Sequence, residues 1–173
     1  MTKTVFGTPA GVLKLNTDGC SKGNPGVSGG GGILRDGGSL LLAFSCYLGH
    51  ATSLQAEVRA LLFGVHLCIQ RGFGKFEVEL DSLELVKILL GKTSYPWGVY
   101  HEIQQLLGLR GHFLRVSHCF RQANQVADAL SNVGCAQGRE EVYTDSSALP
   151  RASRGAMRLD RGGVPSVRRI VQE

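Results

Sequence analysis

Apolar and polar positions alternate in short runs over the first fifty residues, a pattern typical of β-strands. The runs cover Val12–Asp18, Gly30–Asp36 and Leu40–Leu48. A glycine-rich turn over Gly19–Gly32 is expected after the first run, and Asp36–Gly38 joins the other two runs in a hairpin. Three consecutive strands with such connections predict an antiparallel meander.

The period then changes to that of a helix. Thr52 and Gln55 have the spacing of a capping box, and Gly72 ends the segment. Between them, apolar residues repeat every three or four positions, at Leu54, Val58, Leu61, Val65 and Ile69. Glu57 lies beside this apolar stripe, where the desolvation of a carboxylate has to be offset by some other interaction.

The rest of the chain alternates between strand and helix patterns. Strands are predicted at Phe76–Asp81 and His112–Phe120, and helices at Leu83–Leu90, Val99–Leu107 and Asn124–Val133. Because helices separate these later strands, we expect them to join the meander in parallel with its first strand. The predicted class is therefore α/β, with a five-stranded mixed sheet of three antiparallel strands and then two parallel ones, flanked by helices.

Composition divides the 173 residues into two parts. Residues 11–137 contain every predicted element and are expected to form one domain with a buried core. From residue 138 onward there are seven arginines, no lysine and few large apolar residues. That composition predicts a disordered arginine-rich tail over 138–173, whose arginines add weak attraction to phosphates.

Several classes of protein do not fit this sequence. The longest apolar run, Leu40–Phe44, is too short to span a bilayer, and the start has no apolar segment of a secretory signal. Five cysteines without a CxxC pair indicate neither a disulfide framework nor a zinc site. We therefore expect a monomer in a reducing intracellular compartment, the nucleus or the cytoplasm. A net charge of +5 suits a polyanionic partner.

Four acidic residues carry the chemical signal: Asp18, Glu57, Asp81 and Asp128. Asp18 and Asp81 close neighbouring parallel strands, so both side chains are expected at the same edge of the sheet. Asp128 lies in the first turn of the last helix, where the helix dipole favours a carboxylate. Carboxylates gathered in one place repel one another unless cations neutralise them, and oxygen ligands suit Mg²⁺ or Mn²⁺. The pattern indicates a metal-dependent phosphodiester enzyme.

These residues sit in four recognisable segments, TDGCSKGNPG, QAEVRAL, VELDS and RQANQVADAL. Together they resemble the four acidic motifs of the ribonuclease H family. The segments GGGGILRD and RQANQVADALS are similar to its plant branch, including the domains of retroelement-derived plant proteins. The resemblance extends over roughly Val12–Val133. It implies a ribonuclease H-like fold and cleavage of the RNA strand of an RNA–DNA hybrid.

The resemblance also implies roles for single residues. The four carboxylates would hold two Mg²⁺ ions, for which Mn²⁺ can substitute; Asp18 would bridge both ions, and Glu57 would also contact a ribose 2′-OH. His118, ten residues before Asp128, matches a histidine that helps protons and product leave, and Arg121 matches a basic residue with that role in another branch. The positions matching contacts to the hybrid are Gly19, Cys20, Asn24, Thr52, Ser53, Arg121 and Asn124.

The sequence departs from the bacterial pattern in two places. Ser53 and Leu83 stand where bacterial enzymes place amide side chains against the nucleic acid, and Gly91–Leu107 lacks their long basic handle. Two alternative functions stay open. One is a hybrid-binding module without turnover. The other is a 3′–5′ exonuclease on a related fold, although such enzymes carry Asp-x-Glu on the first strand and Cys20 occupies that second acidic position here.

Overall fold

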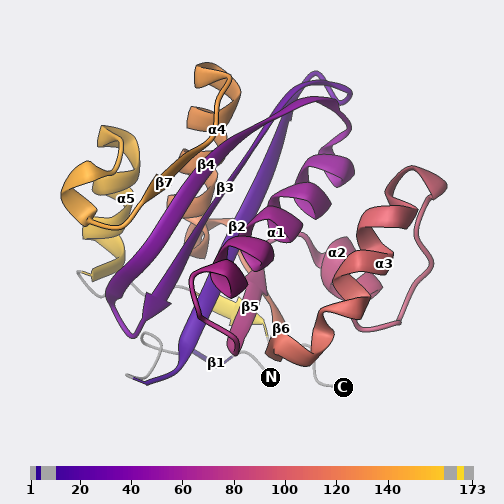
Figure 1. Ribbon diagram of the computed structural model, residues 1–173, viewed down its shortest axis with the longest axis horizontal. Helices are drawn as coiled ribbons and strands as arrows, with labels where there is room; N and C mark the ends of the chain where they lie inside the picture. The colour runs from indigo at the N-terminus through magenta and orange to yellow at the C-terminus, as the bar shows by residue number, and fades with distance from the viewer. Residues whose placement is uncertain (1–2, 5–10, 162–166, 170–173) are drawn as a thin grey trace.

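The computed structural model describes residues 3–4, 11–161 and 167–169, and it shows a mixed sheet with helices on both faces (Figure 1). The strands of these ranges are β1 Lys3–Thr4, β2 Leu13–Lys22, β3 Gly26–Asp36, β4 Ser39–Ala51, β5 Phe76–Leu80, β6 Phe113–Cys119, β7 Glu141–Tyr143 and β8 Val167–Arg169. The helices are α1 Ser53–Gln70, α2 Leu83–Leu89, α3 Tyr100–Gly108, α4 Gln125–Gln137 and α5 Arg151–Arg161, with short 3₁₀ turns η1 Trp97–Val99, η2 Arg110–His112, η3 Arg121–Ala123 and η4 Ser146–Ala148.

The strand order in the described residues is β1-β8-β6-β5-β2-β3-β4-β7. Strands β2, β3 and β4 form the antiparallel meander, β5 pairs parallel to β2, and β6 pairs parallel to β5. The predicted five-stranded mixed sheet is therefore confirmed as the centre of the fold. The structure adds three short strands, β1, β7 and β8, which the sequence pattern did not predict.

The predicted glycine-rich turn over Gly19–Gly32 is wrong in its extent. Only residues 23–25 reverse the chain, because β2 continues to Lys22 and β3 begins at Gly26. The strand positions are occupied by glycines because helix α4 packs directly on β3 and leaves no room for larger side chains. An added Cβ at Gly31 would lie 2.4 Å from the Ser131 nitrogen, and one at Gly134 would lie 2.3 Å from the Cys46 oxygen. The glycine run therefore allows the backbone of α4 to pack closely on β3.

Replacement of Gly31 by alanine is expected to destabilise the protein by about 2–3 kcal/mol, since the new methyl group would push α4 away from β3. The measurement is urea-induced unfolding followed by circular dichroism. Gly38→Ala is the matched control, because nothing lies within 4 Å of a Cβ at Gly38; it should change the free energy of unfolding by less than about 0.5 kcal/mol. Equal effects of the two substitutions would contradict this account of the glycine run.

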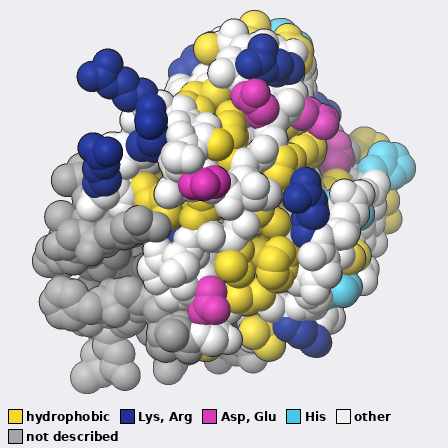
Figure 2. Space-filling view, turned by 60° about the vertical axis from the view of Figure 1, so that its left-hand side comes forward, with side chains coloured by type: hydrophobic (Ala, Val, Ile, Leu, Met, Phe, Trp, Pro, Cys, Tyr) yellow, Lys and Arg dark blue, Asp and Glu magenta, His cyan; other side chains and the backbone are white. Residues whose placement is uncertain are grey.

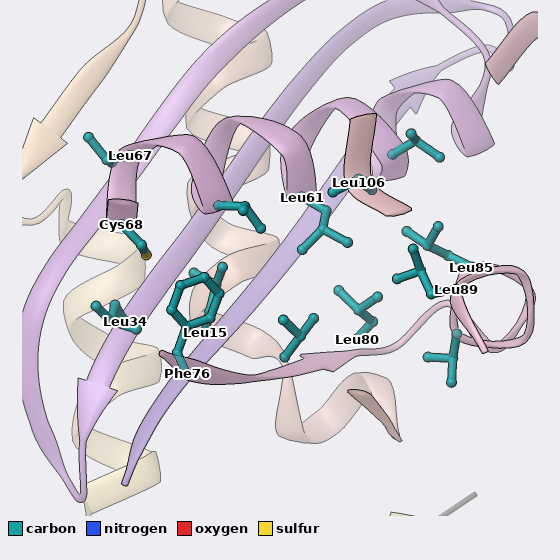
Figure 3. Packing of buried hydrophobic residues seen from close by; sticks show 14 of the residues in the cluster. Leu15, Leu34, Leu61, Leu67, Cys68, Phe76, Leu80, Leu85, Leu89 and Leu106 are labelled. Carbon is teal, nitrogen blue, oxygen red and sulfur yellow. The ribbon is translucent and has the colours of Figure 1, made fainter. Parts of the chain in front are cut away.

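The main hydrophobic core lies between the sheet and helices α1, α2 and α3 (Figure 3). The capping box predicted at Thr52 and Gln55 is present at the start of α1. The middle of the predicted apolar stripe, Val58, Leu61 and Val65, is fully buried. None of the described helices has the length and hydropathy needed to cross a membrane. The core thus fixes α1 against the centre of the sheet.

A second hydrophobic cluster covers the other face and includes the C-terminal part of the chain. Its buried members are Ile33, Ala43, Val126, Leu130, Tyr143, Leu149 and Met157. Strand β7 pairs with β4, and the Tyr143 hydroxyl lies 3.1 Å from the hydroxyl of Ser45. The predicted disordered tail is therefore wrong for residues 141–161, because a few well-placed apolar side chains cover the part of the sheet beside α4. Residues 162–166 and 170–173 lie outside the described residues.

Candidate active site

Strand register brings Asp18 and Asp81 together. Thr17 of β2 pairs in parallel with Leu80, the last residue of β5. The residue that follows each of these two is an aspartate, so Asp18 and Asp81 emerge side by side at the carboxyl end of β5. The Gly19 amide donates a 3.0 Å hydrogen bond to Asp18 Oδ1 and orients that carboxylate. The prediction that both aspartates share one edge of the sheet agrees with this geometry.

Helix α1 supplies the third carboxylate. Its backbone lies directly on β2, since an added Cβ at Gly19 would be 2.3 Å from the carbonyl carbon of Ala56. Only a glycine permits this approach, and it places Glu57 over the strand. One carboxylate oxygen from each of Asp18, Glu57 and Asp81 then lies within 4.8 Å of the other two. We call these three side chains the acidic cluster.

Asp128 stands at the margin of the acidic cluster. It is half-buried on α4, and its charge contributes to the raised pKa of Asp18. It is not one of the three residues that converge within 4.8 Å. The structure therefore brings all four predicted carboxylates into one neighbourhood, with three of them in close contact.

The cluster carries more negative charge than its surroundings neutralise. Burial, followed by the charge of Asp81, raises the pKa of Asp18 from 3.8 to about 7. Burial and the neighbouring Asp18 raise the pKa of Glu57 well above its ordinary value. The pKa of Asp81 is also raised, mainly by burial, although the positive charge of Arg121 opposes this. A bound cation would remove the cost of ionising these groups together.

The donor set fits a hard divalent cation. Its ligands are all carboxylate oxygens, and Glu57 Oε2 is buried without a hydrogen-bond partner. A buried carboxylate oxygen in that state is costly unless something else satisfies it. The cluster borders a pocket of about 270 Å³ lined by Ser53, Leu54, Glu57, Asp81, Ser82, Glu84 and Arg121. Oxygen ligands around an open pocket suit Mg²⁺ or Mn²⁺.

Asn124 links the strand that carries Asp18 to the helix that carries Asp128. It is 2% exposed, and its Nδ2 donates a 3.0 Å hydrogen bond to the carbonyl oxygen of Thr17. Its Oδ1 accepts from Asn16 at 3.3 Å, and its carbonyl oxygen accepts from the Asp128 amide at 3.0 Å. The resemblance implied a contact to nucleic acid here, whereas the structure shows a buried connection beneath the site. The sequence analysis did not predict the role of Asn16. The one indication in the sequence is that an amide side chain lies on the polar side of the first strand.

Replacement of Asn124 by alanine is expected to destabilise the protein by about 1–3 kcal/mol, since the Thr17 carbonyl would lose a buried donor. Chemical unfolding measures the effect. Gln125→Ala is the matched control, because the neighbouring Gln125 side chain is exposed. If both variants unfold at the parental denaturant concentration, Asn124 does not hold α4 against β2.

His118 and Arg121 both lie beside Asp81. His118 pairs in register with Leu80, and its Nε2 lies 3.1 Å from the Asp81 carbonyl oxygen. A carbonyl oxygen only accepts, so Nε2 carries the proton, and Nδ1 is buried without a partner. Arg121, on η3, is exposed and lines the pocket. Both residues are thus within reach of the acidic cluster's edge.

Three of the expected contact positions gather at the start of α1. The Thr52 side chain caps the helix, and Ser53 lines the pocket. The Ser53 amide donates a 2.8 Å hydrogen bond to Asn24 Oδ1, which ties the turn between β2 and β3 to the helix. Asn24 has a left-handed backbone with a φ of 37°. This arrangement places the turn beside the pocket.

Cys20 lies elsewhere. Its Sγ is 2.7 Å from Cys135 Sγ and 3.4 Å from the Ser131 carbonyl oxygen, so the side chain faces α4. Both cysteines are free thiols. Cys20 is not among the residues that line the pocket.

The strand order, the helices on both faces and the acidic cluster at the end of β5 define a ribonuclease H-like domain. A sequence profile of the family described as reverse transcriptase-like matches residues 16–134. The chain belongs to this family.

Solved structures agree with this assignment. The RNase H1 of the halophilic archaeon Halobacterium salinarum superposes with a TM-score of 0.68 at 29% identity, covering 73% of this chain and 99% of that one. LC11-RNase H1, solved in complex with RNA/DNA hybrid, gives a TM-score of 0.68 at 25% identity, covering 72% and 97%. Both likenesses leave about a quarter of this chain uncovered.

Two curated relatives are similar in sequence. An Arabidopsis thaliana protein, provisionally named a ribonuclease H protein, is 30% identical over 167 residues, which cover 92% of this chain and 26% of the relative. Ribonuclease HI of Halobacterium salinarum is 32% identical over 130 residues, covering 66% and 60%. The chain thus spans less than two thirds of the length of either relative.

Proposed function

We propose that this chain is a ribonuclease H-type endonuclease that hydrolyses the RNA strand of an RNA–DNA hybrid. The observation that carries the proposal is the acidic cluster, in which Asp18, Glu57 and Asp81 converge within 4.8 Å at the sheet edge of this fold. A solved neighbour described in complex with RNA/DNA hybrid supports the choice of substrate. Intact carboxylates speak against a module that only binds, since binding does not require them.

Asp18, Glu57, Asp81 and Asp128 would hold two Mg²⁺ ions, and Mn²⁺ would substitute for them. When bound, these ions activate the attacking water and stabilise the leaving 3′-oxygen. Asp18 would be the central ligand, because the other three carboxyl groups all interact with it. The Gly19 amide keeps Asp18 in place. Glu57, half-buried at the pocket wall, would also accept a hydrogen bond from a ribose 2′-OH, the group that distinguishes RNA from DNA.

His118 is proposed to carry protons away from the site. Replacement by alanine should lower the turnover number for hybrid about a hundredfold or more, at the lower end of general acid–base effects. Added imidazole should restore part of the rate, which a purely structural role would not allow. His112→Ala is the control, since that half-buried ring lies 2.7 Å from the Gly74 carbonyl oxygen. Parental turnover in the His118 variant would refute the role.

Cleavage of a labelled RNA–DNA hybrid tests the function itself. We expect cutting with Mg²⁺ or Mn²⁺, none with EDTA, and none of duplex DNA or duplex RNA. A comparison of 5′-labelled with internally labelled RNA separates internal cutting from 3′–5′ exonuclease action. Tight binding of the hybrid without turnover under all metal conditions would instead favour the hybrid-binding module.

A further inference from the structure

Helix α5 lies outside the part of the chain that matches the family profile, which ends at residue 134. It packs beside α4 at the side of the molecule away from α2 and α3 (Figure 1). Met157 and Ser153 are buried on its inner side, and Leu149 precedes it in the same hydrophobic cluster. The helix is therefore a fixed part of the domain, and its outer side has a defined orientation.

Three arginines project from that outer side. Arg151, Arg154 and Arg158 are exposed and stand at positions i, i+3 and i+7, so they follow one side of the helix over about 10 Å. No acidic residue lies between Arg151 and Arg158 in the sequence. Within the described ranges, no ion pair involves any of the three. We call these three residues the α5 arginine face.

The residues between the arginines are small. Ala152 and Gly155 are exposed, and nothing lies within 4 Å of a Cβ at Gly155. Glycine is among the poorest helix formers, and no packing within the described chain requires one here. Small residues flanked by guanidinium groups would let a polymer backbone come close to the helix. Figure 2, which turns this side of the molecule forward, shows several Lys and Arg side chains at its upper left edge, with no acidic side chain visible among them.

We propose that the α5 arginine face binds the phosphate backbone of an RNA–DNA hybrid. Guanidinium groups suit phosphate because they donate two parallel hydrogen bonds and stay charged. The segment Gly91–Leu107 contains a single lysine and no arginine, so it offers little positive charge to a phosphate backbone. The proposal rests on the proposed function only for the identity of the duplex.

The test measures binding of a fluorescently labelled RNA–DNA hybrid in EDTA over a range of salt concentrations. The variant carries Arg154→Gln and Arg158→Gln, which preserve helix propensity. Its slope of log affinity against log salt should become shallower by about 2, since each phosphate contact contributes about 0.9. The charge-matched control carries Arg71→Gln and Lys75→Gln at exposed positions after α1, and its slope should stay within about 0.5 of the parental value.

An unchanged slope in the α5 variant, or equal changes in both double variants, would overturn the proposal. A second variant, Gly155→Glu, keeps all three arginines and improves helix propensity; it should weaken binding, whereas Gly155→Ala should not. If the parent protein cleaves hybrid but the α5 variants bind hybrid with the parental affinity and salt dependence, only this inference fails. If the slope falls but the parent never cleaves hybrid, the proposed function fails and the α5 arginine face stands.

Discussion

Asp81→Asn is expected to abolish Mg²⁺-dependent cleavage of the hybrid, with a loss of at least about 10³-fold. Bound metal ions contribute several kcal/mol of transition-state stabilisation, and each 1.4 kcal/mol corresponds to about a factor of ten in rate. The substitution is nearly isosteric, but it removes one of three carboxylates whose oxygens converge within 4.8 Å. Single-turnover cleavage of labelled hybrid measures the loss.

The same substitution should stabilise the metal-free protein at neutral pH. The pKa of Asp81 is raised by burial and by the charge of Asp128, so its ionised form is unfavourable in the folded state. We therefore expect the Asp81→Asn protein to have a higher Tm than the parent in EDTA, measured by thermal unfolding. Lost activity together with a higher Tm identifies a functional group, because a residue needed only for folding would lower both.

Glu84→Gln is the matched control for Asp81→Asn. Glu84 lines the same pocket but is exposed and does not belong to the acidic cluster. Its replacement should leave the cleavage rate within about threefold of the parental rate, an effect below about 0.7 kcal/mol. If Asp81→Asn keeps parental activity, or if both variants lose activity equally, the acidic cluster is not the catalytic centre.

The stability of the metal-free protein is expected to fall as the pH rises from about 4 to about 7. The pKa of Asp18 is about 7 in the folded protein, against an ordinary value of 3.8. Between these two values the folded state binds more protons than the unfolded state, so the free energy of unfolding decreases with pH. The loss of stability caused by ionising Asp18 is absent below pH 4 and complete above pH 7. Because Asp18 is buried and interacts with Glu57, we expect the free energy of unfolding to fall by a few kcal/mol in total. Each unit of pKa corresponds to about 1.4 kcal/mol.

Divalent ions should reverse this loss. Since they bind the ionised carboxylates of the folded state, Mg²⁺ or Mn²⁺ should raise the Tm more at pH 8 than at pH 5. Thermal unfolding in EDTA and in Mg²⁺, across that range, measures both effects. Asp18→Asn should flatten the decline in EDTA and reduce the Mg²⁺ response. A metal-free protein that gains stability from pH 4 to 7, or an Asp18 variant with the parental pH profile, would contradict the charge balance described for the site.

Local pattern was enough to predict the central elements. Strict alternation identified Phe76–Leu80, and the three-to-four-residue apolar repeat with its capping box at Thr52 identified α1. Parallel pairing of strands separated by helices follows from chain connectivity, so the adjacency of Asp18 and Asp81 was also predictable. These features depend on residues close together in sequence or on general rules of connection.

Other features depended on contacts between distant segments. The glycine run reads locally as a turn, but α4, a hundred residues later, requires glycine where it packs on β3. The C-terminal segment looks too polar to fold, yet Leu149 and Met157 find a surface left open beside α4.

The sequence by itself determined the five central strands, the helix that carries Glu57 and the four acidic motifs, because each can be recognised from local periodicity or from residues spaced closely in the sequence. Only the tertiary structure decided the buried Asn16–Asn124 connection, the packing of α4 on glycine and the orientation of the α5 arginine face. The physical reason is that burial and close backbone contact arise between segments far apart in the chain, and no local pattern encodes which surfaces will meet.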